Sequence, residues 1–222
     1  MINNHSPTLS LRAKGPLACF TRPEMKVERV SYPVMTPSAA RGLIEAVLWK
    51  PAIQWHIQRI SVLAPIEFTA IRRNEVNTKA RAPAAAVVAG GGEIDHYFAE
   101  DDRAQRNTVA LRDVDYVIDA YFTMTDRAGP GDNPYKFIDM FSRRVEKGQH
   151  YHQPYFGCRE FVADVEAADD APEPVDDSRE LGLMLWDIDF DPKGNRPLFF
   201  EARLIDGVLH VPQEPPGNGG AT

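Results

Sequence analysis

The stretch TPSAARGLIEAVLWKP, residues 36–51, decides the fold because it carries a complete set of helix signals. Thr36 stands where an N-cap side chain is expected, Pro37 follows at the first helical position, and Pro51 lies just beyond the end. Apolar residues recur at helical spacing, and these are Ala40, Leu43, Ile44 and Val47. The segment predicts an amphipathic helix.

Strands are predicted on both sides of this helix. Residues 10–20 alternate in part, and Gly15 permits a bulge or a close approach. Residues 53–63 alternate as a strand does, and residues 67–76 follow as their expected pairing partner across Ala64-Pro65. Residues 114–124 predict a further strand.

A second amphipathic helix is predicted over residues 135–148, with Gly148 just past its end. Its expected core side chains are Phe137, Met140, Phe141 and Val145. The remaining strands are predicted at 158–165, 180–190, 197–205 and 208–212. Asp206-Gly207 joins the last two, which is a strong hairpin signal.

The order of elements predicts an α+β fold. Up to about residue 166 the order is β-α-β-(hairpin)-β-α-β, the split βαβ arrangement called ferredoxin-like. We expect this domain over residues 8–166, with a hairpin or loop insertion at about 67–107 that includes the run Gly90–Gly92. A small antiparallel β-sheet domain is expected over residues 176–212.

The bulk properties limit where the protein works. A chain of 222 residues can bury a substantial core. It has no apolar run of the roughly 18 residues that a membrane span requires, and no secretory signal pattern at residues 1–10. We therefore expect a cytoplasmic protein. Cys19 and Cys158 are too few and too far apart in sequence for a disulfide framework, and we expect two buried thiols.

Charge is distributed unevenly along the chain. The net charge of -7 argues against nucleic acid as a partner. However, residues 1–160 hold 21 Lys+Arg against 18 Asp+Glu, whereas residues 161–222 hold 4 against 14. Much of the acid lies in residues 164–180, which we expect to form a solvated linker or mobile loop. The first part of the chain can still present a basic face.

The segment KGQHYHQPYFGCREF, residues 147–161, concentrates chemically active side chains. His150 and His152 lack an obvious third and fourth ligand for a metal ion. Proton transfer is a second interpretation, because histidine titrates near neutral pH. Packing, or stacking of RNA bases on aromatic rings, is a third. The sequence leaves these alternatives open.

Several segments together resemble a known family. Three of them are similar to the subtype I-C CRISPR-associated RAMP protein, the d-type branch of the Cas-five family. These segments are GPLACFTRPEMKVERVSYPVMTPSAARGLIEAVLWKPAIQW, QRNTVALRDVDYVIDAYF and GCREFVADV. The resemblance covers about residues 10–210. It implies a ferredoxin-like domain plus a small β domain, and an endoribonuclease that cuts the CRISPR repeat transcript without metal. It also implies that the protein stays on the 5′ handle of the guide RNA as a subunit of the interference complex.

The family's active site, as the resemblance implies it, is a Tyr, a Lys and a His. Leu48 stands at the Tyr position and Phe137 at the His position, so only Lys136 carries over. Such an enzyme uses the substrate 2′-OH and leaves a 2′,3′-cyclic phosphate and a 5′-OH. Our hypothesis is that Lys136 supplies the cation, and that a loop side chain folding back towards it transfers protons. The candidates in that loop are His150, Tyr151, His152 and Tyr155.

Basic residues near the predicted helices and hairpin are the candidates for RNA contact. They are Arg22, Lys26, Arg41, Lys50, Arg72, Arg73, Arg143, Arg144 and Lys147. We expect no metal and no cofactor. The expected partners are CRISPR repeat RNA, other subunits of the type I-C interference complex and, nonspecifically, duplex DNA. The alternative function is a non-catalytic RNA-binding subunit that caps the 5′ handle, which Leu48 and Phe137 favour.

Overall fold

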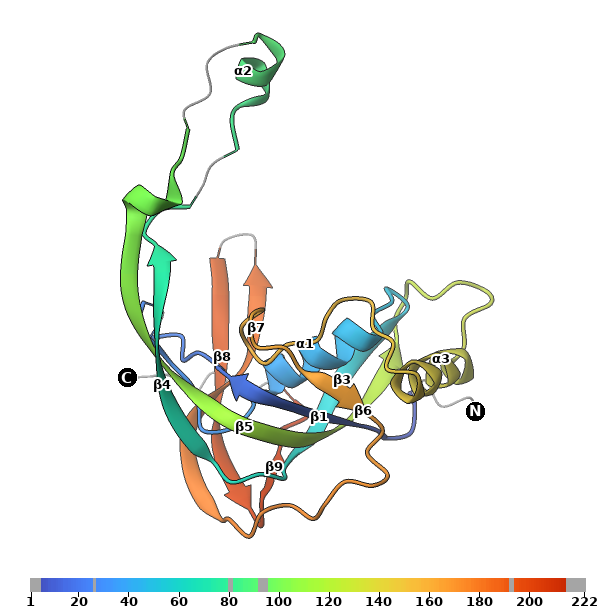
Figure 1. Cartoon of the computed structure of the whole chain (residues 1–222). Coiled ribbons are helices and arrows are strands. Elements are labelled where there is room, and N and C mark those ends of the chain that lie inside the picture. The colour runs from blue at the N-terminus through green and yellow to red at the C-terminus, as the bar shows by residue number, and fades with distance from the viewer. Residues whose placement is uncertain (1–4, 26, 80–81, 92–95, 192–193, 215–222) are drawn as a thin grey trace.

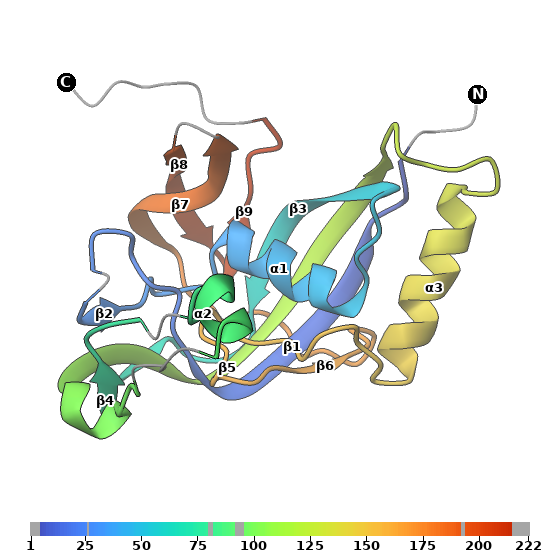
Figure 2. The ribbon, with the colours of Figure 1, turned by 90° about the horizontal axis from the view of Figure 1, so that it is seen from above.

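The computed structural model describes residues 5–25, 27–79, 82–91, 96–191 and 194–214. The chain forms a curled, mostly antiparallel β-sheet with few helices, so the α+β class is confirmed (Figures 1 and 2). In chain order the elements are β1 (Leu9–Ala18), β2 (Arg29–Val30), α1 (Pro37–Val47), β3 (Ile53–Val62), β4 (Glu67–Val76), α2 (Ala85–Ala89), the 3-10 helix η1 (Ala99–Asp102), β5 (Arg103–Met124), α3 (Pro134–Glu146), β6 (Asp164–Glu166), β7 (Arg179–Asp191), β8 (Gly194–Ile205) and β9 (Val208–His210).

Strand β5 is the centre of the sheet. The strand order is β6-β1-β5-β3-β9-β8-β7, and β2 and β4 pair with β5 outside this path. Strand β5 pairs antiparallel with β1 over residues 111–120 and, on its other side, with β3 over residues 116–124. Its first half pairs antiparallel with β4, from Glu67 opposite Arg112 to Val76 opposite Arg103. One long strand therefore joins the body of the protein to a hairpin.

Helix α1 begins where its capping signal predicts, and helix α3 begins one residue before its predicted start, after an N-cap that was not predicted. The Thr36 hydroxyl accepts a hydrogen bond from the Ala39 N–H at 3.3 Å, and the Asn133 side chain accepts one from the Lys136 N–H at 3.1 Å. Helix α1 packs against β3 and β7. Helix α3 buries Phe137, Phe141 and Val145 as predicted, whereas Met140 is only partly buried.

An aromatic cluster joins α3 to the sheet. The Trp55 ring lies 5.2 Å from Phe122 and 5.0 Å from Phe141, measured between ring centroids. Phe137 meets Phe122 edge-on at 6.2 Å. Such contacts add to the burial of apolar area, so this cluster fixes the position of α3 on the sheet.

Two predicted turns are confirmed by their backbone angles. Gly148 has a φ of +59° and ends α3, which is the left-handed conformation that glycine adopts most easily. Asp206 and Gly207 have φ values of +47° and +74°, and they join β8 to β9. A Cβ atom on Gly207 would lie 2.4 Å from the Val175 carbonyl oxygen, so this turn also requires a glycine for space.

The predicted pairing of residues 67–76 with the preceding strand is wrong. Strand β4 pairs with β5 instead. Strand β3 has β5 along one edge, and β9 occupies its other edge at residues 59–61. The Leu63 N–H also donates a hydrogen bond to the Asp115 carbonyl at 2.9 Å, which directs the chain towards β5. The strand expected at 114–124 is longer than predicted, because its pairing with β4 extends it back to Arg103.

The strand predicted at 158–165 is mostly a turn. Only Asp164–Glu166 forms a strand, which pairs with β1. Before it the chain folds back on itself, since the Phe156 N–H donates to the Phe161 carbonyl and the Phe161 N–H donates to the Cys158 carbonyl. Gly157, with a φ of +77°, permits this reversal.

The C-terminal strands continue the same sheet. Strands β7 and β8 form a hairpin, and β9 pairs with both β8 and β3. The division into a domain over 8–166 and a second over 176–212 stays a prediction, and β9 forms hydrogen bonds across it. Between them, described residues 167–178 of the acidic segment contain no helix or strand.

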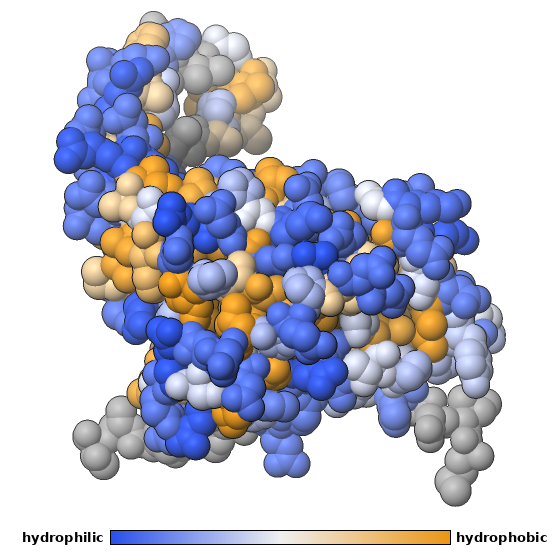
Figure 3. Space-filling view, turned by 60° about the horizontal axis from the view of Figure 1, so that its bottom comes forward, coloured by the Kyte–Doolittle hydropathy of each residue, from blue (hydrophilic) through white to orange (hydrophobic). Residues whose placement is uncertain are grey.

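The insertion at about 67–107 projects from the body as the β4–β5 hairpin, with α2 near its tip (Figure 1). Gly92 of the Gly90–Gly92 run lies outside the described residues. Much of the projecting hairpin surface is hydrophilic, whereas hydrophobic residues gather in patches on the body beside it (Figure 3). No helix in the described part of the chain combines the length and apolar character that a membrane crossing requires.

Candidate nucleic-acid interface

The end of helix α1 turns one side chain inward and the next outward. Leu48 ends the helix in an extended conformation and is fully buried. The indole N–H of Trp55 donates a hydrogen bond to the Leu48 carbonyl at 2.9 Å, which fixes this end of the helix. Because successive residues of an extended segment point in opposite directions, Trp49 faces outward, and it is 53% exposed.

The loop after α3 is fixed on this same end of α1. The N–H groups of Tyr151 and His152 both donate to the Ala46 carbonyl oxygen, at 2.8 and 3.1 Å. The Arg144 guanidinium donates to the Val47 carbonyl. These bonds satisfy carbonyl groups that the end of a helix leaves without partners. They also hold Tyr151, which is 68% exposed, near Trp49.

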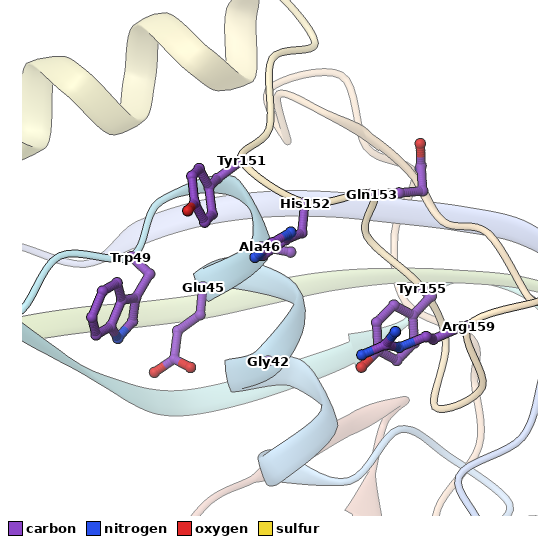
Figure 4. Close-up of a pocket in the computed structure, with 9 residues that line it drawn as sticks. All are labelled: Gly42, Glu45, Ala46, Trp49, Tyr151, His152, Gln153, Tyr155 and Arg159. Carbon is purple, nitrogen blue, oxygen red and sulfur yellow. The ribbon is translucent and has the colours of Figure 1, made fainter. Parts of the chain in front are cut away.

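Together these segments form an open cavity of about 490 Å³ (Figure 4). Figure 4 shows Trp49, Glu45, Tyr151 and His152 around the last turn of α1, and it shows Tyr155 and Arg159 on the loop, overlapping in this view. The Tyr151 and His152 rings touch edge-on, with centroids 4.4 Å apart. The residues that line the cavity are Gly42, Glu45, Ala46, Trp49, Tyr151, His152, Gln153, Tyr155 and Arg159.

Charge in the cavity is partly compensated. Burial raises the pKa of the Glu45 carboxyl, and the neighbouring Arg41 opposes this shift. Arg41 lies 3.8 Å from Glu45 and forms a two-pronged ion pair with Asp187. Arg159 is exposed at the rim. The cavity therefore offers aromatic faces, a histidine, a carboxyl with a raised pKa and a cation.

Lys136 lies away from this cavity, which corrects the expectation that the loop folds back towards it. Lys136 is exposed in the first turn of α3 and forms an ion pair with Asp132 at 2.8 Å. This contact lowers the pKa of the Asp132 carboxyl. The loop follows the other end of α3, and a helix of 13 residues is about 20 Å long. The predicted single site is divided between the two ends of α3.

The four loop residues do not all reach the cavity. Tyr151, His152 and Tyr155 line it, whereas His150 is exposed and is not among the lining residues. The described residues contain no group of three or more His, Cys, Asp or Glu side chains suited to hold a metal ion.

The positions matched to the family's Tyr and His belong to the core. Leu48 is fully buried, and Phe137 is 2% exposed against Phe122. Neither side chain can transfer a proton, and neither faces solvent. A catalytic group of this chain must therefore come from another position.

The predicted RNA-binding residues are in different situations. Arg143 and Lys147 at the end of α3 are exposed, and so is Arg72 on β4. Lys50, just after α1, is partly exposed. These four side chains can reach a phosphate.

Other predicted RNA-binding residues have partners within the protein. Arg73 pairs with Glu75 and Glu160, Arg22 lies over the Tyr32 ring, Arg41 binds Asp187, and Arg144 binds Val47. These contacts explain why a count of basic residues overestimates the free positive charge. Lys26 lies outside the described residues.

Six of the nine lining residues were not predicted as site residues, and three of these six carry a charged or aromatic side chain, namely Glu45, Trp49 and Arg159. Trp49 belongs to the segment that carries the family resemblance, directly after Leu48, so an exposed tryptophan next to a matched position was an available signal. Arg159 belongs to the segment 147–161 that the sequence singles out, whereas Glu45 carries no local signal, because only the packing of the loop on α1 brings it to the cavity.

Comparison with known proteins identifies relatives over almost the whole chain. A family model described as CRISPR-associated protein (Cas5), of the Cas5d type, matches residues 8–212. A protein of Mannheimia succiniciproducens, named CRISPR pre-crRNA endoribonuclease Cas5d, is 49% identical over 213 residues, which cover 92% of this chain and 94% of the relative. A Thermus thermophilus protein of the same name is 39% identical over 224 residues, which cover 93% and 92%.

Solved structures share the fold. A crystal structure described as a CRISPR-associated protein has a TM-score of 0.68 and 19% identity, covering 94% of this chain and 93% of that one. A chain of a CRISPR RNA-guided surveillance complex has a TM-score of 0.52 and 18% identity, covering 96% and 92%. At this level of identity the likeness concerns the fold.

Proposed function

This chain belongs to the Cas5d branch of the CRISPR-associated Cas5 family, and from that premise we propose that it is a metal-independent endoribonuclease of CRISPR precursor RNA. The relatives at 49% and 39% identity are both named pre-crRNA endoribonucleases. The observation that carries the proposal for this chain is the cavity in which exposed aromatic rings, His152 and Arg159 meet beside α1.

The proposed reaction uses the 2′-OH of the RNA as its own nucleophile. A base removes the 2′ proton, an acid protonates the leaving 5′ oxygen, and a cation stabilises the charge on the phosphorane. The products carry a 2′,3′-cyclic phosphate and a 5′-OH. Each proton transfer contributes about 10² to 10⁴ in rate, so positioned side chains suffice without a metal ion.

We assign proton transfer to His152 and its neighbour Tyr151, and phosphate stabilisation to Arg159. Histidine serves as base or acid near neutral pH, whereas tyrosine, with a pKa near ~10, serves as an acid or an orienting hydroxyl. Trp49 and Tyr151 present exposed rings on which unpaired bases can stack. Lys136, at the far end of α3, then contacts the phosphate backbone of the same RNA away from the cut.

The arrangement of the elements supports a ferredoxin-like core. The strands β6-β1-β5-β3 are neighbours in that order, each pair antiparallel, and α1 and α3 follow β1 and β5 in sequence. This order supports our proposal of the split βαβ arrangement that the family resemblance implies. The C-terminal strands β7, β8 and β9 are the proposed small β unit.

We further propose that the cut RNA is retained, with its repeat hairpin and 5′ handle held by this chain as a cytoplasmic subunit of the type I-C interference complex. The structural likeness to a chain of an RNA-guided surveillance complex supports this assembly. Exposed Arg143 and Lys147 supply charge for phosphates, and the same residues can bind duplex DNA nonspecifically.

The second candidate is a non-catalytic subunit that caps the 5′ handle. Burial of Leu48 and Phe137 favours it, because both matched positions lack a proton-transfer group. In this case the aromatic cavity binds unpaired bases and performs no chemistry.

Incubation of excess protein with its own CRISPR repeat RNA in EDTA distinguishes the two candidates. Cleavage products with a 2′,3′-cyclic phosphate support the endoribonuclease. RNA that is bound but uncut supports the capping subunit. Equal binding of repeat RNA and an unrelated hairpin, with no cleavage of either, contradicts both.

A further inference from the structure

The two cysteines, 139 positions apart in sequence, lie side by side at a place that the proposed reaction does not use. Both are buried, Cys19 fully and Cys158 with 6% exposure. The Cys158 thiol donates to the Cys19 carbonyl oxygen at 3.9 Å, and each thiol shifts the pKa of the other. The sequence predicts two buried thiols and gives no sign of this contact.

The backbone holds the two residues together. The Cys19 N–H donates a hydrogen bond to the Phe156 carbonyl at 3.0 Å. A Cβ atom on Gly157 would lie 2.1 Å from the Cys19 carbonyl oxygen, so only glycine permits this approach. The end of β1 and the turn that carries Cys158 are therefore in direct contact.

The surroundings make the two thiols unequal. The Arg29 guanidinium donates a hydrogen bond to the Cys158 sulfur at 3.2 Å. Hydrogen bonding from Cys19, then Arg29, lowers the pKa of Cys158 to about 6 against the opposing effect of burial and of Glu160. The pKa of Cys19 is raised by its contact with Cys158 and by burial, although its contact with Thr21 opposes this. Cys158 is therefore the thiol that more readily forms a thiolate, which is the form that acts as a nucleophile.

We propose that Cys19 and Cys158 form a redox-sensitive pair that hydrogen peroxide, or another small uncharged peroxide, converts to an intramolecular disulfide. The Cys158 thiolate attacks one peroxide oxygen and breaks the O–O bond, giving a sulfenic acid and a hydroxide ion. The Cys19 sulfur then attacks the Cys158 sulfur and displaces its hydroxyl group. With hydrogen peroxide, the sum is two thiols and one peroxide giving one disulfide and two waters; with an organic hydroperoxide, an alcohol takes the place of one water.

The disulfide would act on the segment that borders the RNA cavity. Tyr155 and Arg159 line the cavity and flank Cys158 closely in sequence. A covalent bond to the end of β1 ties this segment to the sheet, and it closes a long loop, which restricts the unfolded chain. It also ends the Arg29 hydrogen bond to the Cys158 thiolate. The inference requires only the folded protein and is independent of RNA cleavage.

The test treats the full-length protein with stoichiometric hydrogen peroxide, then denatures it and alkylates the free thiols. We expect one peptide pair joining Cys19 to Cys158, loss of both alkylation sites, and a rise in Tm of roughly 5–15 °C that dithiothreitol reverses. The disulfide should form more slowly as the pH falls through about 6.

Two variants serve as controls. Cys19→Ser should leave Cys158 as a sulfenic acid or a higher oxide with no internal crosslink, and Arg29→Gln should slow the reaction several-fold at pH 7. Alkylation of both thiols in the peroxide-treated wild type, or a disulfide found only between two chains, overturns the proposal. This result comes from the wild-type protein, so it stands even if a variant fails to fold.

Discussion

The Tyr151 N–H donates a hydrogen bond to the Ala46 carbonyl oxygen at 2.8 Å, which fixes the loop after α3 on α1. Together with the His152 N–H bond to the same oxygen, this contact places the aromatic loop beside Trp49, at the opposite end of α3 from Lys136. The candidate site is consequently a cavity on α1.

Removing an exposed ring of the cavity should weaken RNA binding. Trp49→Ala and Tyr151→Ala each remove a stacking surface worth about 1–3 kcal/mol per base, so Kd should rise roughly 5- to 150-fold. Fluorescence anisotropy with labelled repeat RNA at fixed salt measures the effect. Phe190→Ala is the matched control, since Phe190 is 71% exposed on β7 and is not a lining residue of this cavity. A change in Kd below twofold in both cavity variants contradicts the assignment of this cavity to RNA binding.

Substitutions of His152 and of Lys136 should have different effects on RNA cleavage and RNA binding. His152→Ala should slow single-turnover cleavage by about 10² or more with little change in Kd, because it removes a proton-transfer group. Lys136→Ala should weaken binding mainly at low salt and reduce its salt dependence by about one phosphate contact. His210→Ala, which removes an exposed histidine on β9, is the control. Unchanged cleavage by His152→Ala places the chemistry elsewhere.

Restoring the family histidine at position 137 should cost stability and give no activity. Phe137→His replaces a buried ring that packs edge-on against Phe122 with a polar group. We expect the free energy of unfolding to fall by about 2–4 kcal/mol and Tm to fall by roughly 5–15 °C. Thermal unfolding and single-turnover cleavage are the measurements. Faster cleavage by this variant, or by Leu48→Tyr, moves the active site to the start of α3.

The sequence predicts those parts of the fold that depend on neighbours in the chain. Thr36 caps α1, Gly148 ends α3, and Asp206-Gly207 forms a hairpin turn, and each of these depends on local chemistry. The partner of β4 was not predictable, because it depends on β9 occupying the free edge of β3 from far along the chain.

The site was also predictable only in part, because contacts between distant parts of the chain complete it. Sequence proximity identifies Tyr151, His152 and Tyr155 as one loop, but the length of α3 separates that loop from Lys136. Glu45 joins the loop only through tertiary packing.

His56 should make stability depend on pH. It lies in β3, contacts the Thr123 hydroxyl at 3.0 Å and stacks on Tyr121, and burial followed by Arg41 lowers its pKa. The folded state therefore binds fewer protons than the unfolded state. The contribution of His56 to stability is fully present above its unfolded pKa of ~6.5 and is lost as the pH falls below that value.

The difference in Tm between the wild type and His56→Gln, measured as a function of pH, isolates the effect of His56. The fall in Tm between pH 7.5 and 5 should be smaller in the variant. The raised pKa of Glu45 has the opposite sign, because it favours the folded state as the pH falls, and it is common to both proteins. Parallel Tm curves for the two proteins contradict the buried, neutral state of His56.

The most direct measurement compares single-turnover cleavage, in EDTA, of repeat RNA that carries either ribose or a single 2′-deoxyribose at the cut site. The account predicts that the ribose form alone is cut and that both forms bind equally well. Cleavage of the deoxy form, or a strict requirement for a metal ion, contradicts 2′-OH chemistry at this aromatic cavity.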